Sequence, residues 1–167
     1  MTINISGKVD EEMFNKFITF FNENKTVGKT IYFSSSGGST AIAQACVNLI
    51  TSNDLTNITL IAYSKLYSSG FDIFYKSKCK KIILKDCIGM YHQGNLEVSV
   101  NENLKPVWKE DECKLAYQKI CKLKTIEFCK SLNFSNKNLK LIIKGDDVWF
   151  QNSELQEMLK HSVSPNV

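Results

Sequence analysis

The sequence predicts an α/β fold in which helices cover a parallel β-sheet. Short apolar or alternating segments, typical of strands, are followed by segments in which apolar residues recur at helical spacing. Three such strand–helix units follow one another between residues 3 and 75, and this order is typical of parallel sheets. The length of 167 residues suits one compact domain, so residues 1–167 are predicted to form a single domain.

The N-terminal half contains the three strand–helix units. The first predicted strand alternates in polarity and ends at Gly7, and Asp10 is suited to cap the helix that follows. The second strand runs directly into the pair Gly37–Gly38, and the third is a mostly apolar segment, typical of a buried strand. The predicted strands span residues 3–6, 30–34 and 57–63, and the helices residues 10–21, 39–50 and 68–75.

The C-terminal half is predicted to continue the sheet and then to leave it. Two short strands precede an alternating segment that predicts a hairpin or a protruding strand, and a charged helix of about 36 Å follows. Two shorter helices close the chain, capped by Ser135 and by Asn152 or Ser153, with Gly145 ending the first. The three strands are residues 81–84, 87–91 and 95–100, and the long helix is residues 109–132.

Composition and charge narrow the function classes. The net charge is +4, but all 21 basic residues are lysine, whereas reading of bases and clamping of phosphates favour arginine. We therefore expect no nucleic-acid partner. No apolar run approaches the roughly 20 residues of a membrane span, and the N-terminus lacks the features of a signal peptide. We expect a cytoplasmic protein without a membrane partner.

The cysteines do not indicate a metal site. The sequence contains no CxxC or CxxH pair, and nothing in it indicates export to an oxidising compartment. We expect no metal and no cofactor, and we expect most of the thiols to be buried and reduced. The six are Cys46, Cys79, Cys87, Cys113, Cys121 and Cys129.

Four clusters follow one another in an order that suits a serine hydrolase. The pair Gly37–Gly38 lies between a strand and a helix, where free backbone N–H groups can bind a phosphate or an oxyanion. Ser68 begins the next helix, His92 ends its own strand, and Asp146 and Asp147 come late. A serine nucleophile needs a base and the base needs an orienting group, in any chain order.

Each of these features also has a purely structural interpretation. A glycine pair commonly forms a plain turn, a serine at a helix start is usually a cap, and a lone histidine such as His161 is more often structural. The P-loop and dinucleotide-binding motifs are both absent from the sequence. The joint spacing of the four clusters is what favours a hydrolase.

Together these segments resemble the proteolytic subunit of the Clp protease, within the Clp–crotonase superfamily. IYFSSSGGSTAIAQA is similar to its strand and SPGGS loop, and YSSGF and KKIILKDCIGMYHQ are similar to its serine and histidine blocks. ISGKVDEEMFNKFITFF resembles its opening strand and helix, and DDVWFQNSELQEM its closing aspartate, aromatic and helix. The resemblance covers residues 3–160 and implies a spiral core of repeated β-β-α units with a protruding strand–helix handle, about residues 95–132.

The resemblance also implies roles for particular residues. Ser68 would be the nucleophile, His92 the general base and Asp147 its orienting group, with Asp146 as the alternative to Asp147. The backbone amides of Gly37 and Ser69 would form the oxyanion hole. The implied protein is a homo-oligomeric ring that hydrolyses peptides or unfolded proteins. Because Met1 lies two residues before the first strand, we expect no pore-lining N-terminal segment and little stimulation by a Clp-type ATPase.

Two alternative functions remain open. A crotonase-type acyl-CoA enzyme also uses paired backbone N–H groups, for a thioester enolate, but does not need Ser68 and His92. A catalytically inactive ring or scaffold subunit is favoured by Tyr67 and Asp72, which stand where the Clp subunit has small and apolar residues.

Overall fold

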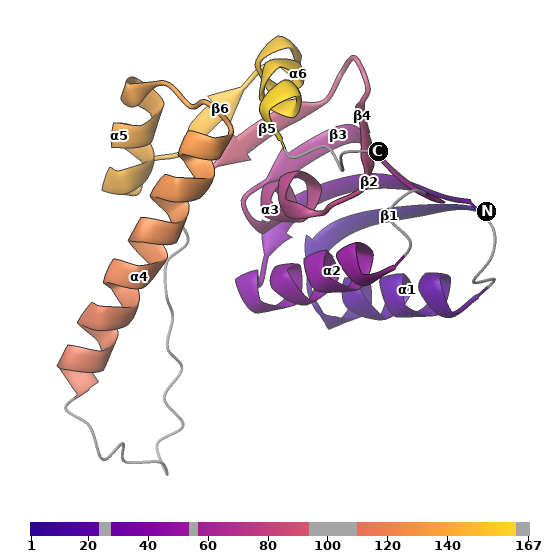
Figure 1. Ribbon diagram of the computed structural model, residues 1–167, viewed down its shortest axis with the longest axis horizontal. Coiled ribbons are helices and arrows are strands. Elements are labelled where there is room, and N and C mark those ends of the chain that lie inside the picture. Colours follow the sequence, from indigo (N-terminus) through magenta and orange to yellow (C-terminus); the bar gives the residue numbers. More distant parts are fainter. Residues whose placement is uncertain (24–27, 54–56, 94–109, 163–167) are drawn as a thin grey trace.

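The computed structural model describes residues 1–23, 28–53, 57–93 and 110–162, except for the side chains of 110–115 and 117. It is an α/β fold with one mixed sheet (Figure 1). The strands are β1 (Thr2–Val9), β2 (Lys29–Gly38), β3 (Ile58–Tyr67), β4 (Lys80–Ile83), β5 (Ile88–Tyr91) and β6 (Val148–Phe150). The helices are α1 (Glu11–Asn22), α2 (Thr40–Ser52), α3 (Ser69–Lys76), α4 (Glu110–Ser131), α5 (Asn136–Lys144) and α6 (Asn152–His161).

The strand order is β1-β2-β3-β5-β6, and β4 pairs with the other end of β3. The pairings among β1 to β5 are parallel, as predicted, but β6 runs antiparallel to β5. The sequence predicted a parallel sheet, and it did not predict the strand β6. A strand of three residues is too short to show a period of two, so only its pairing with β5 reveals it.

Two strands run further than predicted, which matters for the glycine loop. The strand β1 continues through Gly7 to Val9, and β2 includes Gly37 and Gly38. A register shift between Gly7 and Lys8 lets these ends pair, Lys8 with Gly37 and Val9 with Gly38. The glycine pair is thus held at the end of a paired strand and is not a free turn. The last helix also differs from the prediction, since Gln151 is its cap and forms a capping box with Glu154.

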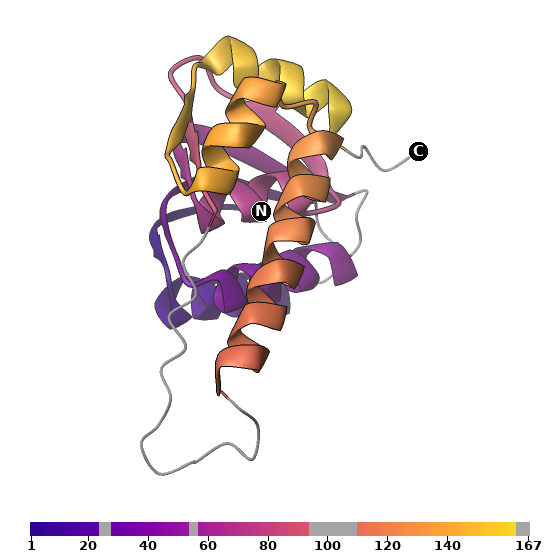
Figure 2. The ribbon, with the colours of Figure 1, turned by 90° about the vertical axis from the view of Figure 1, so that its left-hand side faces the viewer.

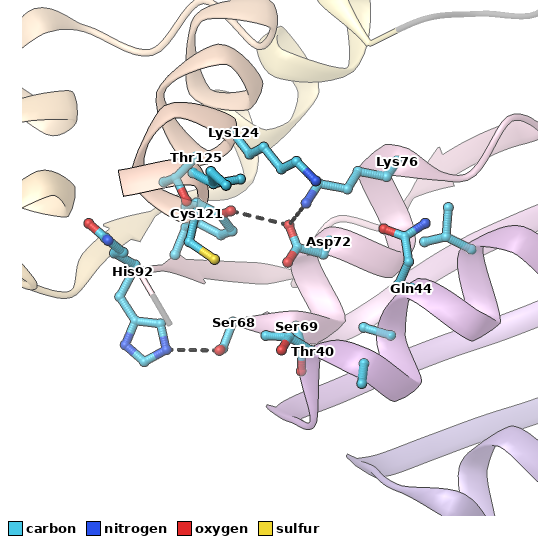
Figure 3. A pocket seen from close by; sticks show the side chains of 16 residues that line it. Thr40, Gln44, Ser68, Ser69, Asp72, Lys76, His92, Cys121, Lys124 and Thr125 are labelled. Carbon is cyan, nitrogen blue, oxygen red and sulfur yellow. Dashed lines mark hydrogen bonds and ion pairs between the residues drawn. The ribbon is translucent and has the colours of Figure 1, made fainter. Parts of the chain in front are cut away.

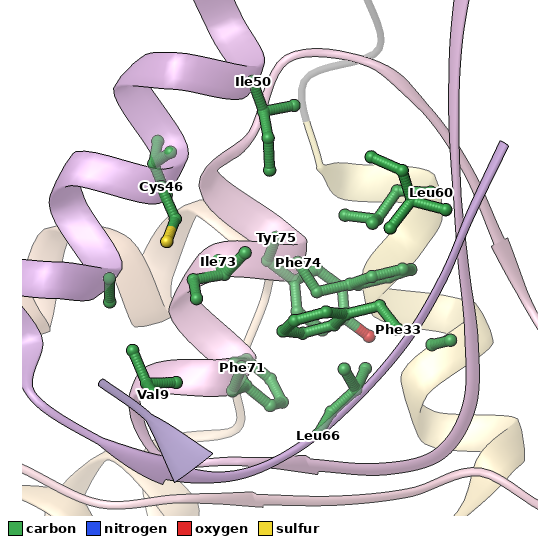
Figure 4. Close-up of a cluster of buried hydrophobic side chains, with 14 of the residues drawn as sticks. Val9, Phe33, Cys46, Ile50, Leu60, Leu66, Phe71, Ile73, Phe74 and Tyr75 are labelled. Atoms are coloured by element: carbon green, nitrogen blue, oxygen red, sulfur yellow. The ribbon is translucent and has the colours of Figure 1, made fainter. Parts of the chain in front are cut away.

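The core is built around α3, which is buried along most of its length. Phe71, Ile73 and Phe74 are fully buried, and Tyr75 donates its hydroxyl to the carbonyl of Leu155 at 2.8 Å. Figure 4 shows these side chains between residues of α2 and residues of the strands β2 and β3. Burial of so many aromatic side chains is the main stabilising contribution here. The helix that begins after Ser68 is consequently held from several sides.

The helix α4 follows the prediction for residues 109–132 within one residue at each end. Figures 1 and 2 show it running away from the sheet beyond the ends of the strands. Near its C-terminal end Phe128 packs edge-on against Phe71 and Tyr91, whereas Ile120 and Leu123 are exposed. The strand predicted at 95–100, and with it the first part of the predicted handle, lies outside the described residues.

The described cysteines carry free thiols, and four of these five residues are buried: Cys46, Cys79, Cys87 and Cys129. Burial raises the pKa of Cys46 and Cys129 to about 12 and that of Cys79 and Cys87 to about 11. A thiol with so high a pKa is a poor nucleophile. Within the described residues, no helix is long and apolar enough to cross a membrane.

Candidate active site

Ser68 lies in the turn between β3 and α3, in a strained backbone conformation. Its φ of 51° and ψ of −122° are unusual for a residue other than glycine. The turn is held by the Ser68 N–H, which donates to the carbonyl of Met90 at 2.8 Å, and by the buried helix that follows. The Ser68 hydroxyl does not cap α3, so the structural interpretation of this serine does not apply. The turn instead presents Oγ outside the helix.

The Ser68 hydroxyl meets His92, which directly follows β5. The distance from Ser68 Oγ to His92 Nε2 is 2.8 Å (Figure 3), and the distance from His92 Nδ1 to Asp147 Oδ1 is 3.0 Å. With its proton on Nδ1, the imidazole donates to the Asp147 carboxylate and accepts the Ser68 hydroxyl through Nε2. The three side chains therefore form one chain of hydrogen bonds, although they come from three segments of the sequence.

The antiparallel strand β6 explains why Asp147 reaches His92. Tyr91 at the end of β5 pairs with Val148 at the start of β6. The residue after the first and the residue before the second therefore lie beside each other, and these are His92 and Asp147. Asp146 is used differently, since its N–H donates to the carbonyl of Leu141 where α5 ends. Of the two aspartates left open by the sequence, Asp147 is the one that contacts the histidine.

The glycine loop lies directly against Ser68. Gly37 has φ of +87°, and a Cβ atom placed on it would stand 2.8 Å from Ser68 Cβ. Its N–H donates to the buried hydroxyl of Ser35 at 3.1 Å, so binding an oxyanion requires this N–H to leave or share that bond. Ser69 is the first residue of α3, where a backbone N–H has no acceptor inside the helix. The two predicted amide donors thus lie beside Ser68: Gly37 contacts it from the end of β2, and Ser69 is the next residue in the chain.

A pocket begins at Ser68 and His92 and extends along α3. Its volume is about 340 Å³, and Figure 3 shows its lining side chains. Asp72 and Lys76 lie four residues apart on α3 and therefore share one face of this helix, and both line the pocket together with Ser68. The helices α2 and α4 supply the remaining walls, with Thr40, Gln44, Cys121, Lys124 and Thr125 among the lining residues.

Asp72 is the least expected group in this pocket. Its Oδ1 atom is 2.9 Å from Lys76 Nζ and accepts the Tyr91 hydroxyl at 3.2 Å. Burial raises the pKa of Asp72, and the neighbouring Lys76 and Tyr91 oppose this only in part. Burial also raises the pKa of Tyr91, and the Asp72 charge adds to the effect. Lys76 and Tyr91 were not among the predicted site residues; the spacing of four between Asp72 and Lys76 was a usable signal for Lys76, whereas Tyr91 reaches the pocket from β5.

In the described part of the chain, no three His, Cys, Asp or Glu side chains come close enough together to hold a metal ion. The site brings together a serine hydroxyl, an imidazole, two carboxylates and backbone amides.

Comparison with known proteins supports the fold through structure alone. No protein-family model matches the chain. No curated protein matches it either. Among solved structures it is similar to a single-residue mutant of ClpP1 from Listeria monocytogenes, with a TM-score of 0.70 and 17% sequence identity. The similarity covers 94% of this chain and 86% of that one. The predicted fold class is therefore confirmed, and this chain has a ClpP-like α/β fold.

Proposed function

We propose that this protein is a serine endopeptidase of the Clp type. The observation that carries the proposal is the chain of hydrogen bonds from Ser68 through His92 to Asp147, at 2.8 and 3.0 Å. His92 removes the Ser68 proton while Oγ attacks the carbonyl carbon of a peptide bond. It then gives the proton to the leaving amine, and water hydrolyses the acyl-enzyme by the same route in reverse. Asp147 orients the ring and stabilises the imidazolium.

The backbone amides of Gly37 and Ser69 are the proposed donors to the oxyanion. Both lie next to Ser68, one across a close contact and one on the next residue of the chain. Removal of one such donor costs roughly 10²–10³ in rate in known enzymes. The bond from Gly37 to Ser35 has to yield when the tetrahedral intermediate forms.

We further propose that copies of the chain assemble into a ring, as the resemblance to the Clp subunit implies. One face of the sheet supports this, because it leaves large apolar side chains exposed: Tyr32, Ile82, Ile88 and Trp149. The α4 helix, with exposed Ile120 and Leu123, is a second surface available to a neighbouring copy. Sedimentation at low and moderate salt tests this, and a strict monomer under both conditions would contradict it.

Labelling by a fluorophosphonate probe is the direct test of the proposed activity. The wild-type protein is expected to be labelled at Ser68 and to hydrolyse short fluorogenic peptides without ATP. The Ser68→Ala variant should show neither reaction while keeping the circular dichroism spectrum of the wild type. A folded wild-type protein that is not labelled would instead support an inactive ring or scaffold subunit.

A further inference from the structure

The pocket beside Ser68 is in the right place to receive a substrate side chain. It is continuous with Ser68 and His92 at one end and reaches Asp72 and Lys76 at the other. When Ser68 Oγ attacks a carbonyl, the side chain of the residue that carries this carbonyl must lie within a few ångströms of the serine. The volume of about 340 Å³ is large enough for a side chain of medium size.

Two polar atoms of this pocket lack hydrogen-bond partners. The hydroxyl of Ser69 is buried and has no partner in the described part of the chain. Asp72 has two partners, Lys76 and Tyr91, and both contact its Oδ1 atom. This leaves Oδ2 without a hydrogen bond among the described residues. Figure 3 shows Asp72 between Lys76 on one side and Ser68 and Ser69 on the other. The buried Ser69 hydroxyl costs free energy unless a ligand satisfies it, whereas the Asp72 side chain is 16% exposed, so its Oδ2 is open to water and to a ligand in the pocket.

The charges around the pocket restrict the ligand further. Lys76 already compensates the Asp72 carboxylate, and Lys124 places a second cation in the lining. A lysine or arginine of the substrate would therefore bring a third positive charge to one carboxylate. A glutamate or aspartate could meet Lys124 but would bring a second carboxylate close to Asp72, and an aliphatic side chain would displace water from Oδ2 and leave the Ser69 hydroxyl without a partner.

We propose that this pocket selects a neutral amide side chain, glutamine or asparagine, in the residue before the scissile bond. The amide N–H₂ donates to Asp72 Oδ2, and the amide oxygen accepts from the Ser69 hydroxyl. The inference rests on the proposed peptidase function and specifies its substrate class. A site that is built to hydrogen-bond a substrate group discriminates strongly against substrates that lack it.

The test compares fluorogenic peptides that differ only in the residue before the cleaved bond: glutamine, asparagine, leucine, lysine or glutamate. The wild-type protein is expected to cleave the glutamine or asparagine peptide with a kcat/KM at least about tenfold above that of the leucine peptide. The double variant Asp72→Leu with Lys76→Met removes the polar pair together and should favour leucine. The matched control is Glu12→Leu with Lys16→Met, an exposed pair of the same spacing on α1, which should leave the preference unchanged.

Ser69→Ala is a second variant that changes the pocket without touching the ion pair. It keeps the backbone amide of residue 69 and should lower the ratio of kcat/KM for the glutamine peptide to kcat/KM for the leucine peptide several-fold, even if the Asp72 double variant does not fold. Labelling of Ser68 in the wild type, combined with a preference for leucine or with no preference, overturns this inference alone. Absence of both labelling and hydrolysis overturns the proposed function and this inference together.

Discussion

The two sides of the candidate active site are built in different ways. Ser68 and the Gly37 loop belong to the parallel part of the sheet, where the backbone is closely packed. A Cβ atom placed on Gly70 would stand 2.5 Å from that of Ser35, so α3 and β2 touch at this point. His92 and Asp147 belong to the antiparallel edge made by β5 and β6, and their side chains are 32% and 50% exposed.

This difference indicates which part of the site is rigid. The backbone around the nucleophile is held by core packing, which permits shifts of only a few tenths of an ångström. The His92–Asp147 pair is positioned by a ladder of three residues at the edge of the sheet, and water can reach it. We therefore expect changes around Ser68 to act through geometry, and changes at Asp147 to be partly compensated by solvent.

The largest effect is expected from the two groups that react directly. Ser68→Ala and His92→Ala should each lower peptide hydrolysis by roughly 10⁴-fold or more, because each removes the activated nucleophile. The double variant should be hardly slower than either single one, since the two residues act as a unit. Steady-state rates of the three variants test this, and additive losses would argue against a joint role.

Asp147→Asn tests the exposed side of the comparison. Loss of the carboxylate should lower kcat by roughly 10²–10⁴-fold, less than the loss of His92, because the imidazole keeps its contact with Ser68. Asp146→Asn is the matched control, and it should leave kcat nearly unchanged because Asp146 bonds through its backbone N–H, and its side chain makes no hydrogen bond within the described part of the chain. An equal loss of kcat in both variants would show that the negative charge of this segment matters and that the contact between Asp147 and His92 does not.

Gly37→Ala tests the packed side. The new Cβ would press on Ser68 Cβ and on the Tyr67 carbonyl, at 2.8 and 3.1 Å, and should lower kcat by roughly 10²–10³-fold, as loss of an oxyanion donor does. Gly145→Ala is the control, because Gly145 has a similar φ of +92° but open space around it. It should cost only about 1–2 kcal/mol of stability and leave kcat unchanged. A similar fall in kcat for both variants would point to backbone strain alone.

The smallest effect concerns the pH dependence of stability through Asp72. Burial raises the folded-state pKa of this carboxyl, with Lys76, Tyr91 and His92 opposing the shift. Its contribution to stability is therefore fully present below the unfolded pKa of about 3.9 and is lost as pH rises through the folded pKa. Asp72→Asn should gain stability relative to the wild type as pH rises above about 4, the unfolded pKa of the carboxyl.

Urea unfolding of both proteins at several pH values measures this gain. Glu157→Gln is a control of opposite sign, because the bond from Lys160 lowers the pKa of the exposed Glu157. The stability that Glu157 contributes is present above its unfolded pKa and is lost as pH falls. A stability difference for Asp72→Asn that shrinks as pH rises would contradict the assignment of Asp72 as a carboxyl destabilised by burial.

The sequence was most informative where local patterns are long. The strand–helix order, the cap at Asp10 and the long helix at 110–131 follow from periodicity and capping, which depend on near neighbours in the chain. The candidates Ser68, His92 and Asp147 also came from the sequence, through spacing and resemblance. Their roles in catalysis remain predictions, although the structure brings the three side chains into contact.

Other features depend on contacts between distant segments, and only the tertiary structure decided them. The strand β6 exists through its pairing with β5, and this pairing selects Asp147 over Asp146. The pairing of Gly37 with Lys8 holds the loop beside Ser68. Likewise, Asp72 becomes a pocket group because Tyr91 and α4 close over it. A local pattern can predict what a segment prefers, but the partner of a hydrogen bond and the burial of a charge are set by residues far along the chain.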